Sequence, residues 1–378
     1  MISPMRSALF ALALLLPLVV FSNEPTDTLL FKGQASVWAG YNHSFESVML
    51  GGRYIPQLNY ERRYPSGSMF DLELSANAYT SWQTEMDLEG RVKPYRAWAR
   101  VSAQQFELRL GLQKINFGSA TIIRPLMWFD QMDTRDPLKL TDGVWGIMGR
   151  YYFLNNANVW FWALYGDDKL KGWEVMPSSN SQPEFGGRVQ YPLPSGEMAV
   201  SFHNRLVEVS KFGFPFQNFK DASENRLGLD AKFNWAIGFW VEASWTHSSA
   251  NLDYLTNQTL VNVGADYTFG IGSGLYAATE LLFASFDKGS IDFYNTASFA
   301  LLSLSYPVTL FDNAGVMAYY NVDTGDFYSF FNWQRQYNRF SFHLMAYWNP
   351  DNANFINQNQ SYSLFGGKGV QLMVVFNH

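Results

Sequence analysis

The chain has 378 residues and no cysteine, and 17% of its residues are aromatic while only 16% are charged, against about 25% in a typical globular domain. Its formal net charge of −6 offers no attraction to nucleic-acid phosphates, and the lack of cysteine excludes disulfides, thiolate metal sites and cysteine nucleophiles. A mean hydropathy of −0.15 leaves too little continuous apolar sequence for a bundle of transmembrane helices.

The first 22 residues predict a secretory signal peptide. Arg6 precedes an apolar core over residues 8–20, and Val20 and Ser22 have side chains acceptable at the −3 and −1 positions of a cleavage site. The alternative is an uncleaved anchor helix, but the apolar core is shorter than the about 20 residues that cross a bilayer. We therefore expect residues 1–22 to be removed and residues 23–378 to form a single exported domain.

Alternation with a period of two runs through most of the remaining chain. In residues 70–79, apolar side chains at even positions alternate with mostly polar ones at odd positions, and similar patterns occupy 106–112, 227–235 and 340–346. On a β-strand this spacing separates the two kinds of side chain onto opposite faces. The runs between turn signals predict eighteen strands, at residues 31–43, 47–61, 68–82, 92–102, 105–117, 143–153, 158–165, 184–192, 196–209, 224–235, 237–248, 256–269, 274–286, 292–306, 308–321, 326–335, 339–348 and 367–376.

The predicted connections alternate in length. Short turns at 65–67, 155–158, 192–196 and 270–274 contrast with a second set that includes long loops at 118–142, 166–183, 210–223 and 349–366. Such asymmetry is typical of outer-membrane barrels, whose short turns are periplasmic and whose long loops are extracellular. Because unpaired strand edges are too costly in lipid, the sheet must close. The sequence thus predicts an all-β, antiparallel, up-and-down transmembrane barrel of about eighteen strands, with sixteen as the alternative count.

With these features the sequence resembles the bacterial outer-membrane β-barrel porins, in particular the eighteen-stranded substrate-selective channels. The resemblance covers residues 31–378 through alternation, loop asymmetry, the near-terminal Phe376 and aromatic residues near strand ends, which include Trp38, Tyr41, Tyr60, Trp82, Tyr151, Tyr152, Trp162 and Tyr165. It implies an outer membrane location, contact with lipid and lipopolysaccharide, and assembly by the barrel-assembly machinery. It also implies that the protein passes small hydrophilic solutes and needs no cofactor, and it allows assembly as a homo-oligomer.

Residues 118–142 form the most unusual predicted loop. Ile122, Ile123, Leu126, Trp128 and Phe129 need burial, and an ordered loop of this length is usually functional. By resemblance to porins, whose third outer loop folds into the lumen, this loop would narrow the pore. The alternative is a loop packed over its own rim by its aromatic side chains. The residues that would line a constriction are Arg124, Asp130, Asp133, Arg135, Asp136 and Lys139.

A second group of candidates lies on the polar faces of the predicted strands. If apolar side chains face lipid, six arginines project into the lumen. The guanidinium group binds carboxylates and phosphates through its planar fork, and the resemblance implies a comparable basic ladder for carboxylated solutes. Three of the six would stand at increasing heights on neighbouring strands. The six are Arg96, Arg100, Arg109, Arg188, Arg205 and Arg226, of which the last three form the rising track.

The alternative is that these arginines are static members of ion pairs within a wet lumen, since such pairs are common and individually weak. Carboxylates on the same face would then be their partners. The predicted pairs are Glu107 with Arg109, Glu184 with Arg188, and Asp230 with Arg226.

Catalysis has little support in the sequence. The five histidines show no metal-ligand spacing, and Ser201 lies too far from His203 along one strand for a hydroxyl–imidazole pair. The sequence therefore predicts neither an enzyme nor a metal site. Two functions remain open: a passive channel for small hydrophilic or acidic solutes, and a non-conducting barrel with a structural or envelope-assembly role whose lumen is blocked by residues 118–142.

Overall fold

The computed structural model describes residues 26–213, 215–216, 218–290, 292–351 and 365–378. The predicted signal peptide at 1–22 and the central part of the predicted loop at 349–366 lie outside these residues.

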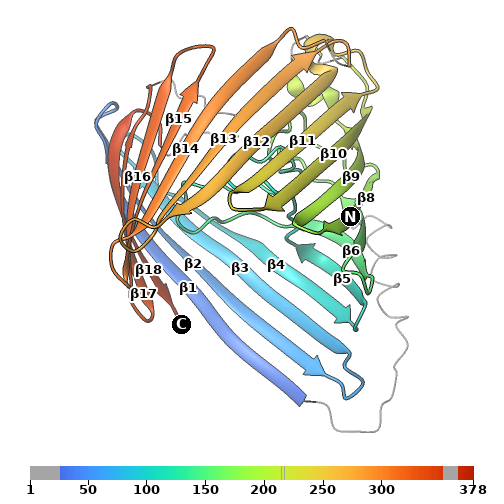
Figure 1. The fold of residues 1–378 in the computed structure, drawn as a ribbon, viewed down its shortest axis with the longest axis horizontal. Coiled ribbons are helices and arrows are strands. Elements are labelled where there is room, and N and C mark those ends of the chain that lie inside the picture. The colour runs from blue at the N-terminus through green and yellow to red at the C-terminus, as the bar shows by residue number, and fades with distance from the viewer. Residues whose placement is uncertain (1–25, 214, 217, 291, 352–364) are drawn as a thin grey trace.

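Eighteen strands form one closed antiparallel sheet (Figure 1). Each strand pairs with its neighbours in sequence, and β1 pairs with β18 to close the barrel, from Gln34 opposite Asn377 to Asn42 opposite Gly369. The prediction of an all-β, up-and-down barrel is confirmed, with eighteen as the strand number. The strands are β1 (Thr26–Asn42), β2 (Ser47–Arg63), β3 (Met69–Gln83), β4 (Glu89–Ser102), β5 (Phe106–Gln113), β6 (Val144–Tyr152), β7 (Asn158–Tyr165), β8 (Pro183–Leu193), β9 (Gly196–Val207), β10 (Ala222–Asn234), β11 (Gly238–Ser248), β12 (Asn257–Phe269), β13 (Leu275–Asp287), β14 (Thr296–Pro307), β15 (Asp312–Asn321), β16 (Phe327–Gln336), β17 (Phe340–Trp348) and β18 (Lys368–Asn377).

Some predicted strand ends differ from the observed ones, and local contacts explain the differences. The strand predicted at 105–117 ends at Gln113, because Ile115 and Phe117 leave the wall and pack inside the lumen while keeping the alternation of a strand. The strand predicted at 308–321 starts at Asp312, whose carboxylate accepts a hydrogen bond from the Thr309 hydroxyl at 2.6 Å and so closes a turn before the strand.

One rim of the barrel carries only short connections, at 64–68, 103–105, 153–157, 194–195, 235–237, 270–274, 308–311 and 337–339. The opposite rim is mixed. It carries long loops at 114–143, 166–182 and 208–221, but also short connections at 43–46, 84–88 and 322–326. Two short 3-10 helices, Val209–Phe212 and Asp253–Leu255, lie in loops of this rim. We call the two ends the short-turn rim and the long-loop rim.

The two faces of the sheet differ in the way that alternation predicts. Mid-strand apolar side chains point outward, and Leu281, Leu302 and Leu372 are 59%, 45% and 59% exposed. Polar inward side chains such as Glu242, Glu280 and Asn262 are fully buried. Such an inside-out distribution is stable where the surroundings of the barrel are apolar.

Among the residues that the structure describes, no helix is long and apolar enough to cross a membrane.

The assignment of faces can be tested on adjacent residues of β14. Leu302 points outward and Ser303 points inward, opposite Ala278 and Met317. We expect Leu302→Arg to lower the free energy of unfolding in lipid by about 2 to 4 kcal/mol and Ser303→Arg to lower it less, because only the first places a charge in the hydrocarbon. Urea unfolding of both variants in lipid vesicles measures this difference. Equal losses would show that the faces are assigned wrongly.

Candidate functional site

The connection between β5 and β6, residues 114–143, runs through the lumen rather than over its own rim. We call it the inner loop. Its first part packs against inward side chains of β6 and β7; the ring of Phe117 stacks on that of Trp162 with centroids 5.7 Å apart. The buried cluster around this contact consists of Ile115, Phe117, Leu126, Trp128, Phe129, Val144, Met148, Trp162 and Leu164.

The middle of the inner loop reaches a different part of the wall. Ile122, Ile123 and Met127 pack against inward side chains of β12 to β16, in a cluster that contains Leu260, Leu282, Phe299, Leu301, Tyr319 and Tyr328. The loop thus bridges the lumen between β6–β7 and β12–β16. These inward positions are apolar although they face the lumen, because the loop covers them. The apolar run on both faces of residues 299–302 was the sequence signal for this contact.

Two buried carboxylates of the wall hold the inner loop by its backbone. Glu280 of β13 accepts hydrogen bonds from the backbone N–H groups of Thr121, Ile122 and Ile123 at 2.9, 3.0 and 2.6 Å, and from the Thr121 hydroxyl at 3.0 Å. Glu242 of β11 accepts from the N–H groups of Ala120 and Leu126 at 2.8 and 2.7 Å. Sequence reasoning missed both glutamates, whose signal was a lone charge in the middle of an otherwise uncharged strand segment.

Two of the predicted constriction residues serve the fold of the inner loop itself. Arg124 and Asp130 pair at 3.1 Å and are only 5% and 2% exposed. Arg124 also donates to the Asn116 side chain and to the carbonyl oxygen of Phe117. This burial removes both residues from the predicted lining of a solute path.

The second part of the inner loop is less buried. Arg135 pairs with Asp133 at 2.9 Å and lies over the Phe365 ring at 5.2 Å, whereas Lys139 is exposed. Burial raises the pKa of the Asp136 carboxyl, and this effect is opposed by a hydrogen bond from the Leu138 backbone N–H. Asp133, Asp136 and Lys139 therefore stay candidates for lining a path.

The end of the inner loop is tied to its surroundings by Asp142. Its carboxylate lies 2.6 Å from the ammonium group of Lys93 on β4 and 3.6 Å from that of Lys169 in the next long loop. Burial alone would raise the pKa of Asp142, but the two ammonium groups hold it below its usual range.

The three arginines of the predicted rising track are buried and paired. Arg188 lies 2.6 Å from Asp230, and both Arg205 and Arg226 pair with Glu224, at 2.6 and 2.7 Å. Glu174, from residues 166–182, also pairs with Arg205 and Arg226, at 2.9 Å each. At 4%, 1% and 3% exposure, Arg188, Arg205 and Arg226 do not present a free basic track, and the structure favours the alternative of ion pairs.

Two of the three predicted pairings are nevertheless wrong. Glu184 contacts His203 at 3.2 Å rather than Arg188, and Asp230 pairs with Arg188 rather than Arg226. Residues four apart on one strand are separated by about 13 Å, whereas adjacent strands lie about 5 Å apart. Glu184 thus reaches His203 on the next strand, and the long Arg188 side chain reaches Asp230 on β10 past the small Ser201 of β9. Arg188 and Glu184 therefore pair with side chains on other strands rather than with residues four positions away on their own strand. The third prediction agrees with the structure, where Arg109 pairs with Glu107 at 3.0 Å.

The arginines of β4 to β6 are more exposed to the lumen. Arg100 pairs with Asp71 at 2.8 Å and lies 3.6 Å from Glu107. Arg150, which sequence reasoning missed, stands opposite Glu107 in the register of β5 and β6, with its guanidinium 3.7 Å from the Trp160 ring centroid. Together with Arg109, this patch has three guanidinium groups, and the carboxylates near them are Glu107 and, on β3, Asp71 and Glu73. We call it the β4–β6 patch.

Arg96, the remaining candidate, supports the inner loop. Its guanidinium donates to the carbonyl oxygen of Thr141 at 3.0 Å and lies 4.0 Å over the Tyr95 ring. It is 7% exposed.

The described part of the chain contains no group of His, Cys, Asp and Glu side chains that could hold a metal ion. Ser201 accepts a hydrogen bond from Arg188, and the His203 ring contacts Glu184 and Trp162. Ser341 does lie 3.1 Å from His343, but within the described residues the second ring nitrogen of His343 has no hydrogen-bond partner to orient it as a base.

A structural role of the Arg188–Asp230 ion pair predicts a loss of stability when Arg188 is replaced, whereas a role in solute binding alone does not. Arg188→Gln leaves the buried Asp230 without its cation, so we expect a loss of about 3 to 5 kcal/mol in the free energy of unfolding. The double variant Arg188→Met, Asp230→Leu should lose less, because it removes both charges. Urea unfolding of the two variants measures this. Wild-type stability of Arg188→Gln would mean that the pair does not brace the wall.

No protein-family model and no curated protein sequence matches the chain. The fold, however, matches solved structures over nearly its whole length. It superimposes on OccAB1 of Acinetobacter baumannii with a TM-score of 0.58 at 8% identity, covering 93% of this chain and 96% of the other. For OccK5 (OpdH) of Pseudomonas aeruginosa the TM-score is 0.57 at 10% identity, covering 92% and 97%.

OmpF of Salmonella typhi, solved in complex with daunomycin, matches with a TM-score of 0.51 at 11% identity, covering 93% of this chain and 97% of that one. At these identities the likeness concerns the fold. The chain has the barrel fold of these porin structures.

Proposed function

We propose that the chain is an outer-membrane porin, a passive diffusion channel for small hydrophilic solutes that is narrowed by its inner loop. The observation that carries this proposal is the anchoring of the inner loop inside a closed barrel by Glu242 and Glu280. A loop fixed in this way sets a passage of constant width, which lets a passive channel sort solutes by size. The apolar outer face of the barrel supports a location in a membrane, and the porin-like fold favours the outer membrane.

The remaining charged groups suggest a preference for acidic solutes. Because Arg188, Arg205 and Arg226 are neutralised, this preference would come from the β4–β6 patch, where the side chains of Arg100 and Arg109 are 23% and 15% exposed and Arg150 adds a third guanidinium group. On the inner loop, Asp133, Asp136 and Lys139 would face the same path.

A non-conducting barrel with a structural role is the second candidate. The observation in its favour is the extent of the apolar contacts on both sides of the inner loop, which involve β6–β7 and β12–β16. A lumen filled by such contacts would keep its shape without passing solutes.

Conductance in planar bilayers separates the two candidates. The variant should replace residues 131–140 by a short Gly-Ser linker, which keeps the Arg124–Asp130 pair and both glutamate anchors in place. We expect the folded wild type to conduct and the variant to conduct more, because the less buried half of the loop is removed. The reversal potential of the wild type in a low-salt gradient, where screening lengths are ~30 Å, should indicate anion preference.

Each other outcome counts against a specific part of the proposal. Absence of current in both proteins would favour the structural role. Equal current would place residues 131–140 outside the constriction, and cation preference would exclude the β4–β6 patch as the selective element.

A further inference from the structure

A second long loop enters the barrel and lies directly on the inner loop. This segment, residues 166–182, connects β7 and β8, and we call it the covering loop. The Trp173 indole donates to the carbonyl oxygen of Arg124 at 2.8 Å, and the Gln258 side chain of β12 donates to the carbonyl oxygen of Trp173 at 3.1 Å. The covering loop is therefore bonded to the inner loop on one side and to the wall on the other.

Gly172 shows how closely the two loops approach. Its φ angle is +45°, and a Cβ atom at this position would lie 1.8 Å from the carbonyl oxygen of Met127. That oxygen belongs to the backbone of the inner loop and has little freedom to move. Only glycine allows this contact, so the position reports on closure of the covering loop.

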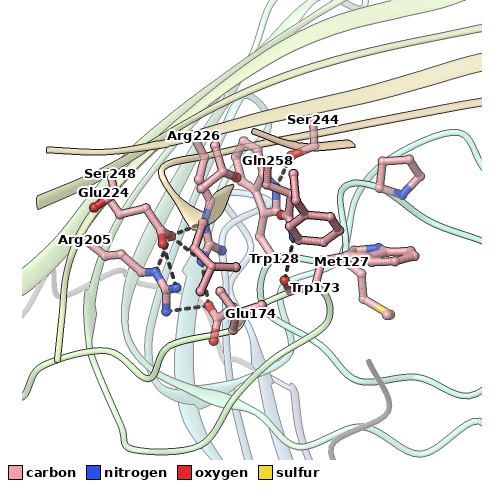
Figure 2. A pocket seen from close by; sticks show the side chains of 15 residues that line it. Met127, Trp128, Trp173, Glu174, Arg205, Glu224, Arg226, Ser244, Ser248 and Gln258 are labelled. Carbon is pink, nitrogen blue, oxygen red and sulfur yellow. Dashed lines mark hydrogen bonds and ion pairs between the residues drawn. The ribbon is translucent and has the colours of Figure 1, made fainter. Parts of the chain in front are cut away.

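Glu174 fixes the covering loop to the wall. One carboxylate oxygen lies 2.9 Å from both Arg205 of β9 and Arg226 of β10, and the other accepts the backbone N–H of Lys171 at 2.9 Å. Figure 2 shows the carboxylates of Glu174 and Glu224 directed at the same two guanidinium groups. All four side chains are buried, at 8% exposure or less.

Glu174 is one of the two carboxylates that pair directly with Arg205 and Arg226. The other is Glu224 of the wall, and the buried Glu184 of β8 adds a further negative charge near Arg205. Withdrawal of the covering loop would leave the guanidinium N–H groups that now face Glu174 without this acceptor, and two such groups side by side are suited to hold a carboxylate.

A pocket lies beside this position, between the covering loop and the inward faces of β9 to β13. Its lining includes Trp128, Trp173, Gln258 and Ser248 together with Arg205 and Arg226, as Figure 2 shows. The lining thus combines indole rings with polar groups next to the two guanidinium groups.

We propose that the covering loop is a lid whose Glu174 occupies a carboxylate-binding position between Arg205 and Arg226, and that soluble carboxylates compete with Glu174 and open the lid. A carboxylated solute that displaces Glu174 would thereby open the space along the inner faces of β9 to β12. The inference takes the proposed channel as its setting, but opening of the lid can be measured without any current.

The test uses the absence of cysteine in the chain. Ser248 is 5% exposed and lines the pocket together with Glu174 and Val175 of the covering loop, so Ser248→Cys introduces one thiol whose labelling reports on access to that pocket. Labelling by iodoacetamide, an uncharged reagent, gives the rate of access in the refolded full-length protein once each rate is measured over a range of pH and divided by the thiolate fraction of that variant, because the thiolate is the reacting species. We expect Glu174→Gln to raise this rate by about tenfold or more, because it breaks a buried pair.

Two further variants keep the test independent of one substitution. Gly172→Ala should also raise the labelling rate, because its methyl group meets the Met127 carbonyl and separates the loops. The charge exchange Glu174→Arg, Arg226→Glu should restore slow labelling, because it keeps opposite charges at the two positions of this ion pair. Glu208→Gln, which removes a partly exposed ion pair with Lys211 in residues 208–221, is the matched control and should leave the rate unchanged.

Competition is tested with sodium acetate against sodium chloride at equal ionic strength. Acetate should raise the labelling rate of the Ser248→Cys protein more than chloride does, and this difference should disappear when Glu174→Gln is added. Wild-type rates in both Glu174→Gln and Gly172→Ala, with the barrel still folded, would overturn the lid. Equal rates in acetate and chloride would overturn the carboxylate-binding position. A failure to conduct in bilayers would leave both results unaffected.

Discussion

The structure depends on the mutual satisfaction of buried carboxylates in the barrel wall and backbone donors in the inner loop. Glu242 and Glu280 are fully buried, and an isolated charge in such a place is very unfavourable. The N–H groups at residues 120–123 and 126 have no strand to pair with and would be unsatisfied in an apolar lumen. The carboxylates and the N–H groups hydrogen-bond to each other, so neither is buried without a partner. The loop is therefore a required part of the barrel rather than an attachment to it.

The buried arginines on the inner wall also find their partners partly in the loops. Arg188 shares Asp230 with the hydroxyl of Ser119 in the inner loop, so the ion pair also fixes the start of that loop. Arg205 and Arg226 share Glu174 with the covering loop. Charges that would suit solute binding on an empty wall are used here to hold loops. The partly exposed arginines of the inner wall are mainly those of the β4–β6 patch.

The barrel could be predicted from the sequence because a single feature, the alternation of apolar and polar residues, determines where the strands lie. Alternation at every second residue assigns both the strands and their faces, and it depends on local order alone. It misled where loop residues kept the same period, as Ile115 and Phe117 do beyond the end of β5, and at 308–311, where a turn precedes β15. Strand pairing between consecutive segments then follows from short turns, since neighbours in the chain become neighbours in the sheet.

The site could be predicted only in part, because its contacts join residues far apart in the chain. Glu280 meets Thr121 across 159 positions, and Arg188 meets Asp230 across 42. Nothing local marks these partners, so same-strand spacing suggested Glu184 for Arg188 instead. The apolar content of the inner loop did indicate that the loop is buried. The apolar inner faces of β12 to β16, against which the loop packs, are explained only once this contact is known.

The central claim is that wall carboxylates hold the inner loop by its backbone. Hydrogen exchange of the amides at residues 120–126, measured by mass spectrometry, tests it most directly in Glu280→Gln. Because a carboxamide replaces one acceptor by a donor, we expect exchange about tenfold or more faster than in the wild type, with the strands still protected. Glu61→Gln, at an exposed pair with Arg63 near the short-turn rim, is the control. Unchanged protection of these amides in Glu280→Gln would contradict the account.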